Sequence, residues 1–178
     1  MSDLARECGI SKPLLYHYVS DKYELLSEIT ESHVTRLEAL VGEVASLGLA
    51  PAPRLRELIR RFVHEYAQAR HDHGVLTQDV KFLEPKDRNR VLRKERAVVA
   101  AFAATIAQAR PELAQAALDK PLTMLLFGMI NWMFTWLSPE GRLRHDDMAP
   151  IVADLFLGGL GAVNPPSVTS AASVKARD

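Results

Sequence analysis

Hydroxyl, basic and aromatic side chains gather near the start of the chain, a combination that suits contact with a nucleic acid. The candidates, with one leucine among them, are Ser11, Lys12, Leu14, Tyr16, His17, Tyr18 and Lys22. Two short helices meeting at a tight turn around Gly9 would project most of these side chains from the second helix, which suits entry into a DNA major groove. Lys22 opens the next helix, where its cation and the first free amides can bind a phosphate together.

A second set of candidates consists of aromatic and methionine side chains at helical spacing, which suit the apolar body of a small ligand. They are Phe62, Tyr66, Phe102, Met129, Trp132 and Met133, with Asn131 and His64 as candidate polar contacts. The same pattern is typical of an ordinary helical core, so the alternative that these side chains only pack stays open. A basic run from Lys86 to Arg96 could meet phosphates of the ligand or form a solvated helix face.

Patterns for catalysis or metal binding are weak. His71 and His73 are two residues apart and do not share a helix face, which argues against a metal site. Cys8 is the single cysteine, so no disulfide can form within the chain, and we expect a reducing cytoplasm. The sequence lacks the G-x-S-x-G, phosphate-loop and H-E-x-x-H motifs, and we expect no enzymatic activity.

The charge of the chain is balanced, with 22 basic and 22 acidic residues among 178. Such a chain has no global field for nucleic acid or membrane, so contact with DNA would have to come from a local patch. The longest apolar stretch, Leu122 to Leu137, contains Asn131 and is shorter than the roughly 20 residues that a membrane span needs. We therefore expect a buried helix there and no membrane association.

Apolar residues recur at helical spacing almost throughout, and alternating strand patterns are absent, which predicts an all-α fold. The predicted helices cover residues 2–8, 11–18, 20–46, 54–71, 75–83, 86–109, 121–137 and 147–160, with a loop or short helix at 111–120. Breaks are expected from Gly48 to Pro53 and from His71 to Gly74. A small core of the first two helices is expected from Leu4, Ala5, Ile10, Leu15 and Val19.

Residues 2–26 resemble the DNA-binding signature of the TetR family. The ordered matches are Asp3-Leu4-Ala5, Cys8-Gly9-Ile10-Ser11, Leu15-Tyr16-His17-Tyr18-Val19, and Lys22 followed by Leu25-Leu26. Val19 replaces the usual Phe, and Leu14 stands where Thr or Ser is common. The resemblance implies a helix-turn-helix head with a connecting helix at residues 1–46 and a ligand-binding and dimerisation domain at 47–163. The tail at 164–178, rich in Pro, Ser, Ala and Thr, is expected to be disordered.

The resemblance also implies that the first helix of the family, and the basic arm that often precedes it, are missing from the chain as written. Residues 1–40 carry four basic and seven acidic residues, so we expect weak DNA binding. The competing hypothesis is a helical dimeric interaction module that has lost DNA binding through truncation at its N-terminus.

The last two predicted helices are expected to pair across a two-fold axis as a four-helix bundle, as TetR relatives do, although a monomer with a buried central helix is the alternative. The stretches from Leu126 to Trp132 and from Ala153 to Leu160 look like a TetR subgroup that responds to acyl-CoA thioesters. The resemblance thus implies a cytoplasmic repressor that a small-molecule effector, with acyl-CoA as its class, releases from a double-stranded DNA operator.

Overall fold

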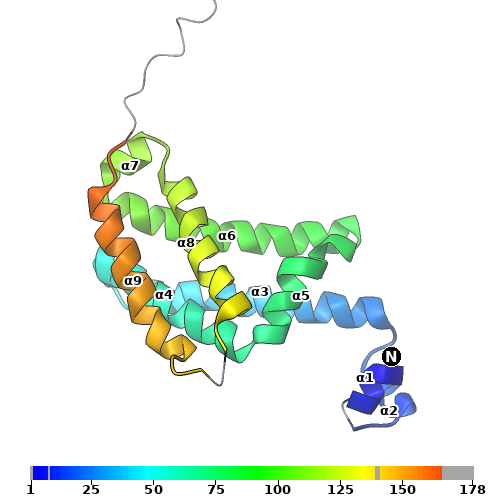
Figure 1. Ribbon diagram of the computed structural model, residues 1–178. Helices are drawn as coiled ribbons and strands as arrows, with labels where there is room; N and C mark the ends of the chain where they lie inside the picture. Colours follow the sequence, from blue (N-terminus) through cyan, green and yellow to red (C-terminus); the bar gives the residue numbers. More distant parts are fainter. Residues whose placement is uncertain (1, 8, 139–140, 166–178) are drawn as a thin grey trace, which may run out of the picture.

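A small helical head and a larger helical body are joined by one long helix, α3 (Figure 1). The computed structural model describes residues 2–7, 9–138 and 141–165, and every regular element in those ranges is helical. The all-α fold expected from the apolar spacing is therefore confirmed. The helices are α1 (Ser2–Glu7), α2 (Lys12–Tyr18), α3 (Lys22–Ser46), α4 (Pro51–Gln68), α5 (Arg70–Asp79), the 3-10 helix η1 (Val80–Phe82), α6 (Pro85–Ala109), α7 (Pro111–Gln115), α8 (Asp119–Trp136) and α9 (His145–Ala162).

The head is a pair of short helices packed around a few apolar side chains. Ala5 and Val19 are buried, and Ile10 and Leu25 pack against them, which confirms three members of the expected small core. The turn between α1 and α2 uses Gly9 in the left-handed region, with φ at +65°. Cys8 and the side chains of Leu4 and Leu15 lie outside the described residues.

Helix α3 carries the chain from the head into the body. Asp21 caps its first turn, because the side chain accepts a hydrogen bond from the backbone N–H of Glu24 at 2.8 Å. Further along, its buried face packs against α4, α5 and α6. The residues of that face are Thr30, His33, Val34, Leu37, Leu40 and Val44.

Two expected breaks differ in the structure. Helix α4 begins at Pro51 rather than at residue 54, because a proline in the first helical turn loses no hydrogen bond there. The turn expected from His71 to Gly74 is wrong: the break between α4 and α5 falls at Ala69, and residues 71–74 form part of the first half of α5. Gly74 costs such a helix about 1 kcal/mol relative to Ala, and the helix is held by its packing on α3, where Leu76 is buried.

The body is built on α3, α4 and α6, with α9 packed on α4 and α8 packed on α6. Phe62, Phe102 and Phe127 meet at its centre, and the rings of Phe62 and Phe102 lie edge to face with 4.9 Å between centroids. None of the described helices combines the length and the apolar character that a membrane span requires. The predicted tail beyond residue 165 lies outside the described residues.

Candidate functional site

The polar and aromatic residues of the head face outward. Ser11, Lys12, Leu14, Tyr16, His17 and Lys22 are all exposed, whereas the side chain of Tyr18 lies outside the described residues. Ser11 caps α2 by accepting a hydrogen bond from the backbone N–H of Leu14 at 3.3 Å. The Lys12 ammonium lies 5.9 Å from the centre of the Tyr16 ring, close enough for a cation–π contact. The structure therefore presents these side chains together, at the end of α3 remote from α9 (Figure 1).

The body contains a cavity of about 650 Å³ between α3, α4, α5, α6 and α8. This volume lies in the range of small-molecule pockets, roughly 300–1,000 Å³. Its wall is mostly apolar, and Leu37, Leu76 and Phe127 contribute to it. The same wall carries polar groups, so an apolar ligand with a few hydrogen-bonding atoms would fit it.

The aromatic and methionine candidates are spread over three environments. Of the six, Tyr66 lines the cavity. Phe62, Phe102 and Met133 are buried in the core, and Met129 is half-buried against it. Trp132 stands on the surface with 68% of its area exposed.

The two candidate polar contacts also lie apart. Asn131 lines the cavity. His64 is exposed on α4, with its Nδ1 atom 3.1 Å from an Asp146 carboxylate oxygen.

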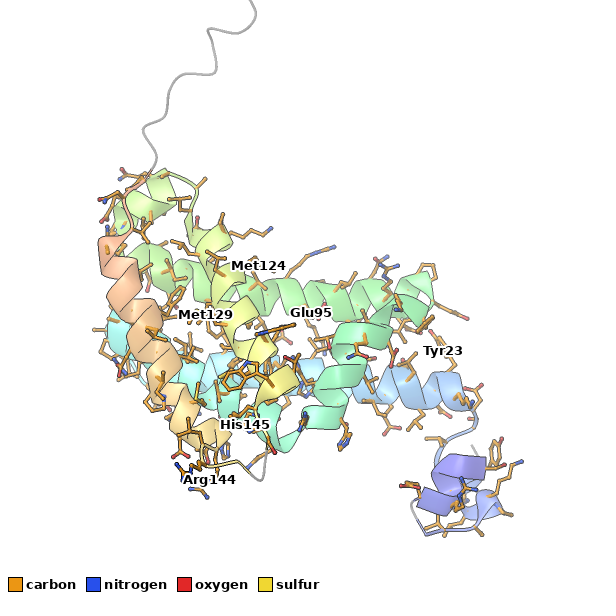
Figure 2. The ribbon with its side chains drawn as sticks, viewed as in Figure 1. Tyr23, Glu95, Met124, Met129, Arg144 and His145 are labelled. Atoms are coloured by element: carbon orange, nitrogen blue, oxygen red, sulfur yellow. The ribbon has the colours of Figure 1, made fainter. Side chains whose placement is uncertain are left out.

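The residues of the cavity wall that sequence reasoning missed include His73, Glu95 and Met124. Figure 2 shows Glu95 on α6 and Met124 on α8. The one signal in the sequence was that Glu95 is the single acid between Arg88 and Arg96, a stretch rich in basic residues. His73 gave no such signal, because it was placed in an expected turn.

His73 sits in a buried cluster of rings. Its imidazole stacks on Tyr66 with 3.6 Å between ring centroids, and its Nδ1 atom lies 3.3 Å from Nε2 of His33. Burial and, to a lesser extent, the neighbouring His33 lower the pKa of His73 to about 4. Burial also lowers the pKa of His33. Both imidazoles are therefore neutral at pH 7.

Two buried polar atoms in the cavity wall lack a hydrogen-bond partner among the described residues: Nε2 of His73 and Oδ1 of Asn131. The Asn131 amide acts to raise the pKa of His73, so the two side chains are neighbours. They nevertheless form no hydrogen bond of acceptable geometry with each other. Glu95, in the same wall, is half-buried, and burial raises its pKa.

The basic run of α6 is divided between internal contacts and solvent. Arg90 pairs with Glu31 at 2.6 Å and with Asp87 at 2.9 Å. Lys94 donates to the Thr35 hydroxyl at 2.6 Å. The exposed side chains that remain available to an anion are Lys86, Arg88, Arg93 and Arg96, and Arg96 lines the cavity.

A row of exposed apolar side chains runs along α8 and α9, which lie side by side. Its members are Leu125, Trp132 and Trp136 on α8 and Ile151 and Leu155 on α9. Spacings of seven and four residues place each set on one helix face. We call this surface the α8–α9 apolar face. An exposed cluster of large apolar residues typically marks an interaction surface.

The head end of α3 is tied to the body by Tyr23. Its hydroxyl donates to the Asp87 carboxylate at 2.6 Å and accepts a hydrogen bond from the backbone N–H of Glu84 at 3.1 Å. Figure 2 shows Tyr23 on the part of α3 that leads to the head. The hydrogen bond lowers the pKa of Asp87 and raises the pKa of Tyr23. The contact joins the first turns of α3 and α6.

Two families match the sequence. Residues 48–160 match the family described as tetracyclin repressor-like, C-terminal domain. Residues 1–29 match the family described as bacterial regulatory proteins, tetR family. No curated protein sequence matches the chain significantly.

Several solved structures resemble the chain. A TetR-family transcriptional regulator from Bordetella parapertussis is 31% identical, with a TM-score of 0.82 over 93% of this chain and 86% of that chain. The TetR family transcriptional regulator PfmR from Thermus thermophilus is 24% identical, with a TM-score of 0.74 over 88% of this chain and 86% of that one. AibR, solved in complex with isovaleryl coenzyme A and operator DNA, is 22% identical, with a TM-score of 0.70 over 93% and 86% of the two chains. The likeness to PfmR and AibR shows the fold.

Proposed function

The chain belongs to the TetR family of bacterial regulatory proteins, and on that premise we propose that it is a repressor which a small-molecule effector releases from its operator. It is a DNA-binding transcriptional regulator, with a helix-turn-helix head and a helical C-terminal domain. The observation that carries the proposal is the cavity of about 650 Å³, because α3 forms part of its wall and also leads to the head. The proposed repressor needs no catalysis, and it would act in the cytoplasm, where its DNA target lies.

The proposed DNA contacts are the exposed residues of the head. Tyr16 and His17 lie on α2, the helix that would enter the major groove. Lys12 and Lys22 supply positive charge for phosphates at the starts of α2 and α3. Tyr18 belongs to the same proposal through its position in the sequence.

The proposed partner of the α8–α9 apolar face is a second copy of the chain. Five large apolar side chains on two adjacent helices are exposed there, and a two-fold axis would bury them against their own equivalents. The resulting four-helix bundle would place two heads on one duplex, which matches a palindromic operator.

The proposed effector class is an acyl-CoA thioester. The cavity has the volume and the apolar wall that an acyl chain needs. Arg96 and Lys120 are exposed members of the same wall and could pair with phosphates outside it. The support from AibR is that this protein of the same fold was solved with isovaleryl coenzyme A and operator DNA.

Fluorescence anisotropy with labelled promoter DNA from upstream of the gene tests the proposal. The protein is titrated first alone and then with isovaleryl coenzyme A, octanoyl coenzyme A or free coenzyme A. We expect binding to the promoter and release by at least one thioester, with free coenzyme A as the matched control. Binding without release by any thioester would contradict the effector class. Failure to bind the promoter would contradict the proposed repressor function and favour the alternative, a helical interaction module.

A further inference from the structure

We propose that His73 and Asn131 form a polar anchor in the cavity, which selects an effector whose enclosed part is neutral and carries a hydroxyl group. This inference rests on the proposed effector cavity and adds the chemistry of the group that enters it. His73 is only 7% exposed, and its Nε2 atom has no hydrogen-bond partner among the described residues. Oδ1 of Asn131 is also buried and lacks one. Buried polar atoms are costly unless they are paired, so a ligand that pairs both is favoured.

The neighbouring histidine fixes what His73 can offer. Nε2 of His33 and Nδ1 of His73 lie 3.3 Å apart, so one of these nitrogens donates a hydrogen bond and the other accepts it. When His33 is the donor, the neutral His73 ring carries its own proton on Nε2. A hydroxyl oxygen can accept that proton's hydrogen bond and donate its own hydrogen to Asn131 Oδ1. Both atoms are buried, so the proposed binding of the hydroxyl between them requires a rotation of the half-buried Asn131 amide.

Glu95 disfavours an anionic group placed beside it in the cavity, whereas Arg96 and Lys120 are exposed members of the same wall. The Glu95 side chain lines the cavity, is half-buried, and forms no hydrogen bond or ion pair among the described residues. The exposed Arg96 is the basic neighbour whose charge acts on it. A partly desolvated carboxylate repels a second carboxylate brought beside it. A neutral hydroxyl meets no such repulsion, so the cavity distinguishes an alcohol from the carboxylate of the same chain length.

Octanol and octanoate are a matched pair of probes for this distinction. Ligand-induced shifts in the unfolding temperature of the full chain at pH 7.5, measured over a range of probe concentrations, give the two dissociation constants. We expect octanol to bind roughly tenfold more tightly than octanoate to the wild type, which corresponds to one or two hydrogen bonds to buried groups. N131L should weaken octanol binding severalfold, and E95Q should strengthen octanoate binding.

T77V is the matched control, because Thr77 also lines the cavity but its hydroxyl already donates to the His73 carbonyl at 2.9 Å. It should leave both affinities unchanged. Equal binding of the two probes to the wild type would overturn the anchor, and so would unchanged octanol binding by N131L. Promoter release by a thioester without any preference for octanol would overturn this inference alone. Preference for octanol without release by any thioester would instead overturn the proposed effector class.

Discussion

The imidazole of His73 lies nearly parallel to the ring of Tyr66, at 21° and with 3.6 Å between the two centroids. The stack joins α5 to α4 beside the cavity. It also encloses His73 so fully that the charged form of the imidazole loses its solvation, and this lowers the pKa to about 4. Burial of this ring therefore makes folding depend on pH.

The free energy of unfolding should fall as the pH falls from 6.5 to 4. In this window the unfolded chain binds a proton at His73 that the folded chain does not, so the stabilisation present above pH 6.5 is progressively lost. The loss between pH 7 and pH 5 should be about 2 kcal/mol for this group. The lowered pKa of His33 also reduces the free energy of unfolding as the pH falls. The raised pKa of Glu95 has the opposite effect, because Glu95 in the folded chain holds its proton to higher pH than in the unfolded chain.

Urea unfolding at pH 7 and pH 5 measures this dependence. H73F keeps an aromatic ring on Tyr66 but cannot be protonated, so its stability should change less between the two pH values than that of the wild type. H71F, which removes an exposed histidine of α5, is the control and should keep the wild-type dependence. An H73F variant with the full wild-type dependence would contradict the assignment to His73.

Replacement of Lys12 or Lys22 by Ala should weaken promoter binding and reduce its dependence on salt. Each lysine that pairs with a phosphate contributes about 0.9 to the slope of log K against log salt concentration, and a dimer carries two copies of each. Anisotropy titrations between low and physiological salt measure the slope. K86A removes an exposed lysine of the body and is the control. If K86A lowers the slope as much as K12A does, the head is not the source of the phosphate contacts.

The helices of this chain could be predicted because each buries a regular stripe of apolar side chains. The head motif could be predicted as well, since short-range spacing fixes both of its turns. The wrong turn at His71 to Gly74 had a local cause. Residues that usually break helices are held in α5 by the packing of this helix on α3, which is a tertiary contact.

Most of the cavity wall could not be read from the sequence for a related reason, although Tyr66 and Asn131 were among the candidates. Aromatic spacing indicates which side chains turn inward, but not whether they meet each other or an open space. Phe62 and Phe102 fill the core, whereas Glu95 and Asn131 from two other helix faces line the cavity. That outcome depends on the packing of α8 on α6, which no local pattern encodes.

Replacement of Trp132 by Glu should convert the proposed dimer into a monomer. Trp132 is 68% exposed on the α8–α9 apolar face, and a central aromatic residue typically contributes about 2 kcal/mol or more to an interface, roughly a thirtyfold change in dissociation constant. Light scattering coupled to gel filtration gives the mass, and circular dichroism checks the fold. F82E alters an equally prominent apolar side chain outside this face, 63% exposed, and should leave the mass unchanged. A W132E variant with the mass of the wild type would place the interface elsewhere.

Replacement of Tyr23 by Phe should uncouple the cavity from the head. The hydroxyl joins the head end of α3 to Asp87 and to the backbone of Glu84, so a shift of α6 around a bound effector can reach the head through it. Y23F should bind promoter DNA within about twofold of the wild type, since the removed group lies outside the proposed DNA contacts. A thioester that releases the wild type should then need a severalfold higher concentration to release Y23F.

The control is T35V, which removes another α3 hydroxyl in contact with α6, about three helical turns further from the head. Its release curve should match that of the wild type, because the part of α3 nearest the head keeps its tie to α6. Equal effects of Y23F and T35V would mean that general packing of α3 on α6, rather than the Tyr23–Asp87 contact, transmits the signal. Release of Y23F at the wild-type concentration would remove this contact from the mechanism altogether.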